Sequence, residues 1–278
     1  MDPAIAHLLD DPSPVVRKAL LAHFNAQGAA AAAFLRLQAE RKGPAGRAAV
    51  RFLREMSFSD PVEDFRLFIR SLNYELETGF VLLARTVSPL ADAGVCHAAL
   101  DAIAARCREL LVEPSNTREK CRMINRVLFH EWGFRGDPEH VTDPRNSLID
   151  QVLARRKGLP IALSTVYLLV AGRLGLDLYP VGLPGLFLVG GESEGTPFFA
   201  DPQDQGALRS EEEVVDLLRQ RDYTPQPGEL GPTPVREMLC RSCRTLVNHY
   251  REGGESDKAR LFAGFIEEFE AAYVRNER

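Results

Sequence analysis

The apolar positions follow a helical spacing through the first half of the chain. Ser13 stands at an N-cap position with Pro14 after it, and Gly28 marks the end of the segment. The apolar face between them consists of Val15, Val16, Ala19, Leu20 and Phe24. Two further helices are predicted at about 29–42 and 45–56. These three helices would form a small helical arm.

The helical pattern continues beyond residue 60. Asp60, Pro61 and Glu63 form a helix-start signal, and the periodicity runs on through 73–85. We expect helices at about 91–111 and 117–132, and another that is capped by Asn146 or Ser147 and ends near Gly158. Pro160 is predicted to begin the next helix, which reaches about Leu174 and stops at Gly175.

Short apolar runs then replace the helical pattern. The segments 178–183, 186–189 and 197–200 are separated by Gly and Pro and are typical of one antiparallel sheet. Ser210 and Glu213 form a capping box for a short helix, 223–234 is a Pro-rich linker, and helices at about 234–251 and 255–275 close the chain. The predicted fold class is therefore α+β, mainly helical with a small antiparallel sheet.

Composition and charge narrow the function classes. The chain has 278 residues, with 34 Lys and Arg against 39 Asp and Glu, which leaves a formal charge of -5. This balance disfavours a broad nucleic-acid interface. The printed sequence begins with neither a secretion signal nor a membrane span, so we expect a cytoplasmic protein without membrane contact. The oligomeric state is not predictable from these features.

The cysteines suit a reducing compartment. Cys96, Cys107, Cys121, Cys240 and Cys243 form an odd set, and we interpret them as buried thiols. Cys240 and Cys243 have CxxC spacing, which a zinc or redox site would use, but no second pair or nearby His accompanies them. We therefore expect no metal and no cofactor.

Four blocks in a fixed order resemble one known family. They are Asp-Pro-Arg-Asn-Ser-Leu-Ile-Asp at 143–150, Arg-Arg-Lys-Gly-Leu-Pro-Ile-Ala-Leu-Ser at 155–164, Gly-Leu-Pro-Gly-Leu-Phe-Leu-Val at 182–189, and Asp201-Pro202. From about residue 60 to the C-terminal helices the chain resembles the SirB-type transglutaminase-like family. The resemblance implies a papain-like core: a helix with the nucleophile position at its N-terminus, followed by strands that carry a histidine and an acid.

The chain departs from that implied triad at two positions. A thiol at a helix N-terminus is activated by unpaired N–H groups, and an imidazole oriented by a carboxylate takes its proton. Here the cysteine position falls at Pro160, and where the family reads Pro-Gly-His-Phe this chain has Leu186 in place of the histidine. Asp201 remains, although an Asp before Pro is more often a turn former than a catalytic orienter.

Other side chains could substitute for the missing groups. Ser164 lies one turn beyond Pro160, but no histidine occurs between His140 and His249 to serve as its base. His130 and His140 have acidic neighbours, and His130 is more simply interpreted as a helix-end residue. Ser164 is therefore a weak catalytic candidate beside a core interpretation.

A basic cluster precedes the helix at Pro160. The candidate ligand-binding residues are Arg145, Asn146, Arg155, Arg156 and Lys157, which would select an acidic ligand. The alternatives are that the cations complement a helix dipole or stay solvated, and that Asn146 is an N-cap.

The predicted elements and the resemblance together give a domain organisation. We predict a HEAT-like arm at 1–57, for which a lone helical cap is the alternative, a transglutaminase-like core with leading helices at 58–222, and a tetratricopeptide-like hairpin at 223–278. The predicted function is a non-catalytic scaffold or regulator that binds a protein partner. The alternatives are a cysteine-type or serine-type hydrolase or transferase with a rearranged site, and an anion-binding module without a glycine-rich phosphate loop.

Overall fold

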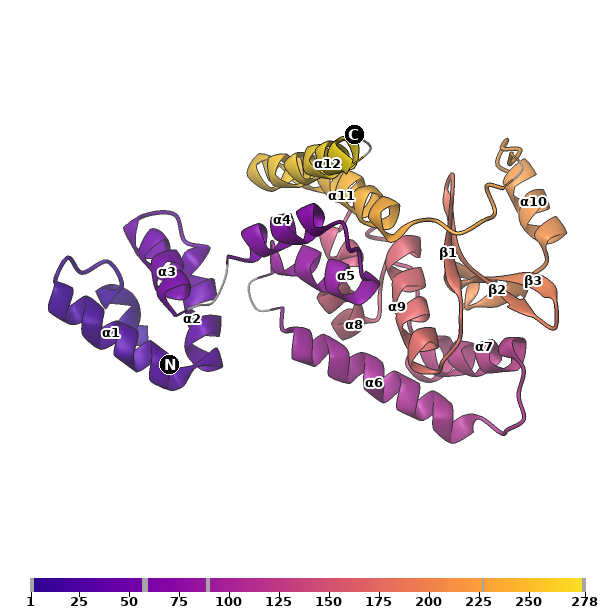
Figure 1. Ribbon diagram of the computed structural model, residues 1–278, viewed down its shortest axis with the longest axis horizontal. Coiled ribbons are helices and arrows are strands. Elements are labelled where there is room, and N and C mark those ends of the chain that lie inside the picture. The colour runs from indigo at the N-terminus through magenta and orange to yellow at the C-terminus, as the bar shows by residue number, and fades with distance from the viewer. Residues whose placement is uncertain (1–2, 57–59, 89–90, 227, 277–278) are drawn as a thin grey trace. The chain divides into compact units, whose positions relative to one another are not determined.

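The computed structural model describes residues 3–56, 60–88, 91–226 and 228–276, and it confirms the α+β class (Figure 1). The chain divides into two compact units. The first comprises 1–68 with 82–91, and the second comprises 69–81 with 92–278. The predicted boundary between 57 and 58 lies outside the described residues, and the predicted division into three domains stays a prediction.

The first unit contains a short 3₁₀ segment, η1 (Pro3–Leu8), and three helices, α1 (Pro14–Gln27), α2 (Ala29–Ala39) and α3 (Pro44–Glu55). Phe24 and Phe52 meet edge to face at 5.2 Å in its apolar core. Ser13 occupies the N-cap position as predicted, but its side chain makes no capping hydrogen bond.

The prediction that one helix continues from residue 60 through 73–85 is wrong, because two separate helices cover this segment. α4 (Pro61–Ser71) begins as predicted, with Asp60 accepting a hydrogen bond from the Val62 N–H. The backbone then turns at Leu72 with a φ of 58°, and the Glu75 carboxylate accepts from the N–H groups that open α5 (Leu76–Arg85). This local cap replaces continued helix.

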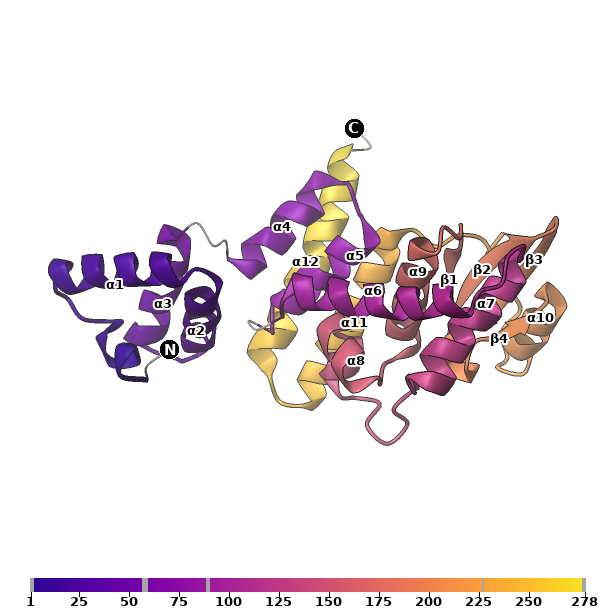
Figure 2. The ribbon, with the colours of Figure 1, turned by 90° about the horizontal axis from the view of Figure 1, so that it is seen from below.

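Helices surround the centre of the second unit. These are α6 (Ala93–Leu110), α7 (Thr117–Asn125) with its π-helical continuation η2 (Arg126–Glu131), the 3₁₀ turn η3 (Pro144–Ser147), and α8 (Ile149–Arg155). α9 (Pro160–Arg173) packs against α6, α7 and α8 as well as the sheet (Figure 2). Residues 161–171 are all buried, which explains why this segment is apolar on every face.

The sheet has four antiparallel strands in the order β1-β2-β3-β4. They are β1 (Tyr179–Leu183), β2 (Leu186–Ser193), β3 (Thr196–Asp201) and β4 (Ala207–Arg209), the last of which the sequence did not indicate. The turn η4 (Pro202–Asp204) joins β3 to β4. α10 (Glu211–Arg219) begins with the predicted Ser210–Glu213 capping box.

A helical hairpin closes the second unit. α11 (Val235–Glu252) and α12 (Ser256–Asn276) pack along each other, with Tyr250 and Phe262 stacked at 5.7 Å. α11 also packs against η3, so the hairpin belongs to the same compact unit as the sheet.

Candidate functional site

Pro160 opens α9, as predicted. Its half-buried ring occupies the first helical position, where the missing N–H costs no hydrogen bond, and the Leu163 N–H already bonds to the Leu159 carbonyl oxygen at 2.9 Å. The side chain carries no sulfur, oxygen or nitrogen. The helix N-terminus therefore presents a hydrocarbon at the position where the resemblance implies a nucleophile, and that assignment stays a prediction.

Leu186 begins β2 and is 4% exposed. It belongs to an apolar group, here called the α10-side cluster, that consists of Val181, Leu183, Leu186, Leu188, Phe199, Val214 and Leu218. Among the described residues this cluster includes side chains of β1, β2, β3 and α10, and none of α9. Because successive side chains in a strand point to opposite faces, Leu186 packs toward α10.

Ser164 lies fully buried in α9, and its hydroxyl donates to the carbonyl oxygen of Phe187 at 3.1 Å. The bond ties α9 to β2. Within the described part of the chain, no imidazole forms a hydrogen bond with this hydroxyl. His130 is exposed in η2, and His140 Nδ1 lies 3.3 Å from Asp137.

Asp201 ends β3 and is buried. Its carboxylate accepts hydrogen bonds from the N–H groups of Gln203 at 3.1 Å and Asp204 at 3.4 Å, and Arg209 lies 3.5 Å away. The contacts confirm the turn-forming interpretation, because the carboxylate caps η4.

The basic cluster surrounds a carboxylate that sequence reasoning missed. Asp137, whose side chain is 2% exposed, lies 3.3 Å from Arg155, 3.1 Å from Lys157 and 3.3 Å from His140. Burial alone would raise the pKa of Asp137. The hydrogen bonds from Lys157 and His140 outweigh this effect and hold the pKa below its usual value. Its partners lie up to 20 residues away, so no local pattern identifies it.

Asn146 is not an N-cap, and the prediction that it or Ser147 caps the following helix is wrong. α8 begins after Leu148 without a side-chain cap. Asn146 is fully buried: its Nδ2 donates to the His140 carbonyl oxygen at 2.8 Å, and its Oδ1 accepts from Arg155 at 3.1 Å. Its own carbonyl oxygen accepts from the N–H of Leu159, next to the start of α9.

The two outer arginines of the cluster have partners as well. Arg145 pairs with Asp143 at 2.8 Å, and the Asp143 pKa stays low because the bonds from Arg145 outweigh its partial burial. Arg156 has a left-handed backbone with a φ of 59°, donates to the Trp132 carbonyl oxygen, and lies 5.3 Å from the Trp132 ring. Partners within the chain thus compensate most of the positive charge of the basic cluster. Anion binding at this cluster stays a prediction.

The thiols are all buried and free. Burial raises the pKa of Cys96, Cys121 and Cys240 to about 11 and that of Cys107 to about 12, and it also raises that of Cys243. None has the lowered pKa of an activated nucleophile.

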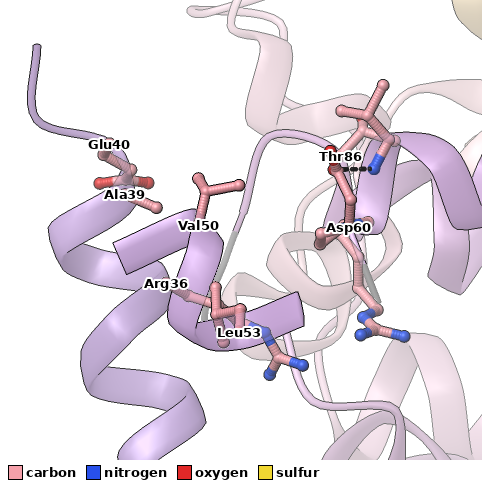
Figure 3. A pocket seen from close by; sticks show the side chains of 10 residues that line it. Arg36, Ala39, Glu40, Val50, Leu53, Asp60 and Thr86 are labelled. Atoms are coloured by element: carbon pink, nitrogen blue, oxygen red, sulfur yellow. Dashed lines mark hydrogen bonds between the residues drawn. The ribbon is translucent and has the colours of Figure 1, made fainter. Parts of the chain in front are cut away.

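Metal clusters, membrane-spanning helices and pockets away from the predicted site residues also bear on function. Within the described ranges, no three His, Cys, Asp or Glu side chains cluster as a metal site would require, and no helix has both the length and the apolarity to cross a membrane. A pocket of about 200 Å³ lies in the first unit, and Arg36, Val50, Leu53 and Asp60 contribute to its lining (Figure 3). No predicted site residue lines it.

Comparison with known proteins gives a family match. The profile of the transglutaminase-like superfamily matches residues 95–244. A UPF0162 protein of Xylella fastidiosa is 32% identical over 185 residues, which cover 64% of this chain and 66% of the relative, just under two thirds of its length. A UPF0162 protein of Vibrio cholerae is 33% identical over 115 residues, 41% of this chain and 43% of that protein.

A more distant similarity involves a longer protein. F-box only protein 21 of Mus musculus is 42% identical over 66 residues, which cover 24% of this chain and 10% of that protein. No solved structure matches the chain.

Proposed function

Since the chain belongs to the transglutaminase-like superfamily, we propose that it is a non-catalytic, SirB-type protein of this fold that binds a protein partner in the cytoplasm. The proposal depends on the two positions at which the fold normally carries proton transfer and bond making. Pro160 supplies no nucleophile, and Leu186 packs among the apolar side chains of the α10-side cluster.

The remaining polar groups support the same conclusion. The Ser164 hydroxyl donates a hydrogen bond to a backbone carbonyl oxygen, and the Asp201 carboxylate caps the turn η4. A serine mechanism requires a general base, most often an imidazole, within about 3.2 Å of the hydroxyl. No observation favours that arrangement, so the hydrolase alternative has no support from the contacts of Ser164.

Partner binding has separate support. In F-box only protein 21 the similar segment fills 10% of the protein, which fits the use of this fold beside other parts of a chain. The hairpin offers a docking surface at its end, where Tyr273 is 49% exposed and Val274 is 53% exposed on α12. Exposed apolar side chains in a group favour protein contacts.

A turnover assay tests the catalytic half of the proposal. The full-length protein would be incubated with activated esters, peptide amides and glutamine–amine pairs, beside an Asp201→Ala variant. We expect both proteins to match the buffer blank. Turnover by the wild-type protein that disappears in Asp201→Ala would overturn the non-catalytic assignment.

Affinity capture tests the binding half. Tagged full-length protein would be expressed in its native cells and cross-linked, with Tyr273→Lys/Val274→Glu as the altered surface and Val112→Glu as a matched control, because Val112 is 81% exposed outside the hairpin. We expect one partner of defined stoichiometry that only the hairpin variant loses. Recovery of no such partner would contradict the binding role.

A further inference from the structure

A second pocket lies where β1 ends and α11 begins. It has a volume of about 510 Å³, and its lining includes Gly182, Leu183 and Pro184 from the strand end and Arg241 and Thr245 from α11. All of these residues belong to the second compact unit. Leu183 and Pro184 lead into the turn that precedes Leu186, but the pocket contains none of the residues discussed as catalytic positions.

Arg241 is held in a fixed orientation at this pocket. Its Nη2 donates to the Leu183 carbonyl oxygen at 2.9 Å, and its guanidinium lies 5.4 Å from the centre of the Phe187 ring. A Cβ at position 182 would come within 2.4 Å of Nη1, so glycine there leaves the space that the guanidinium occupies. One hydrogen bond uses only part of a group with five donors.

Within the described residues, no carboxylate lies at ion-pair distance from Arg241. Glu237, one turn earlier on α11, is paired with Arg244 at 2.9 Å and acts on Arg241 only from longer range. Arg241 is half-buried, and this burial lowers its pKa. A carboxylate beside the guanidinium would offset that desolvation.

A second guanidinium adds positive charge to the same turn. Arg221 donates to the Gly185 carbonyl oxygen at 2.6 Å. Glu229 and Glu237 line the pocket together with Arg241 and Arg244. The Glu229 carboxylate, however, already accepts from the Tyr223 hydroxyl at 2.7 Å and the Gln226 N–H at 2.8 Å. With Glu229 and Glu237 in the lining, a singly charged carboxylate fits better than a doubly charged phosphate.

We propose that this pocket binds the side-chain carboxylate of a glutamate or aspartate in an acidic peptide segment of a partner protein. Arg241 donates to the carboxylate, because its planar fork matches two carboxylate oxygens. Pro184, which is exposed, and the partly exposed Tyr223 pack against the apolar part of the peptide. The inference rests on the proposed partner-binding function and identifies one site at which it acts.

Calorimetric titration of the full-length protein tests the site. The probe is an acetylated and amidated peptide of alternating alanine and glutamate, and the comparison peptide has glutamine in place of glutamate. We expect the glutamate peptide to bind and the glutamine peptide not to bind. Arg241→Gln is expected to weaken binding by about ten-fold or more, because a charge-assisted bond is lost. Arg251→Gln removes the same charge from α11 outside the pocket lining and should leave the affinity unchanged.

A second pair of variants keeps Arg241 intact. Thr245 lies one turn after Arg241 and lines the pocket, so Thr245→Glu places a carboxylate four residues from the guanidinium. This internal carboxylate should displace the peptide, whereas Thr245→Gln, of nearly the same size, should retain it. The pair remains informative if Arg241→Gln fails to fold.

Three outcomes would overturn the inference. They are equal binding of the two peptides, unchanged affinity in both Arg241→Gln and Thr245→Glu, and displacement of the glutamate peptide by inorganic phosphate at equal or lower concentration. None of these results changes the expected lack of turnover or the capture of a partner through α12, so a failure here is distinguishable from a failure of the proposed function.

Discussion

The hydroxyl of Ser164 lies 3.1 Å from the carbonyl oxygen of Phe187, 23 residues later in the chain. Both groups are buried, so the bond satisfies a strand carbonyl that water cannot reach. The side chain that the sequence made only a weak catalytic candidate thus joins α9 to β2.

Removing that hydroxyl should cost stability without any effect on chemistry. We expect Ser164→Ala to lower the free energy of unfolding by about 1–3 kcal/mol, because the Phe187 carbonyl oxygen loses its donor. Urea denaturation measures the change. Ser242→Ala is the matched control: its hydroxyl is equally buried but has no hydrogen-bond partner among the residues that the structure describes, so its loss should be neutral or stabilising. Equal losses in the two variants would contradict a structural role for the Ser164 bond.

Introducing the histidine that the resemblance implies at position 186 should destabilise the protein. Leu186→His places an imidazole in the α10-side cluster, and we expect a loss of about 2–4 kcal/mol at neutral pH. The loss should grow as the pH falls below about 6.5, because only the unfolded chain then takes up the proton readily. Leu186→Met should lose less than about 1.5 kcal/mol. Urea unfolding curves at pH 8 and pH 5.5 test this prediction. A smaller loss of unfolding free energy at the lower pH would indicate a solvated imidazole.

The thiols should react slowly in the folded protein. With a pKa of about 11, roughly one in a thousand Cys96, Cys121 or Cys240 side chains is a thiolate at pH 8. Labelling by a maleimide should therefore be slow in buffer and rapid in urea, as mass spectrometry would record. Rapid stoichiometric labelling of one thiol in buffer would reveal an activated cysteine.

The same shifts predict a loss of stability in base. A thiol whose pKa is raised by folding keeps its proton in the native state after the unfolded chain has begun to lose it near pH 8.5. Stability should be fully present below that pH and fall as the pH rises toward 11. Urea midpoints measured at pH 7.5 and pH 10 test the sign; a higher midpoint at pH 10 would contradict it.

Asp137 should stabilise the fold only while it is ionised. Asp137→Asn removes the anion shared by Arg155, Lys157 and His140, so we expect a lower melting temperature at pH 7. Because folding lowers the pKa of Asp137, its contribution is present above the unfolded value near 3.9 and disappears as the pH falls further. The two proteins should converge as the pH falls below the lowered pKa of Asp137. Asp177→Asn, at an exposed position, is the control and should match the wild type at pH 7 and at acidic pH.

Local signals were predictable and distant ones were not. Pro160, Gly175 and the Ser210–Glu213 box mark helix ends through interactions within one turn, and all three were found from the sequence. The cap at Glu75 and the short strand β4 were missed because helical periodicity and apolar runs outweigh such weak signals.

In the candidate site, too, features set by nearby residues were predictable and features set by distant residues were not. Residue types at 160 and 186 are readable from the sequence, whereas the face of the sheet that Leu186 occupies depends on register. Asn146 looked like a cap because Asn favours that position, but its buried amide serves residues six and nine positions away. The ion pairs around Asp137 and the fixed guanidinium of Arg241 arise only when the chain has folded.

The burial of residues 161–171 of α9 also constrains how the second unit comes apart. The sheet, α6, α7, α8 and the turns η3 and η4 all cover this helix, so no single one of them can detach without wetting it. Amide hydrogens of 164–170 should therefore exchange with deuterium only through global opening, at one common rate, while those of the surrounding helix ends exchange earlier.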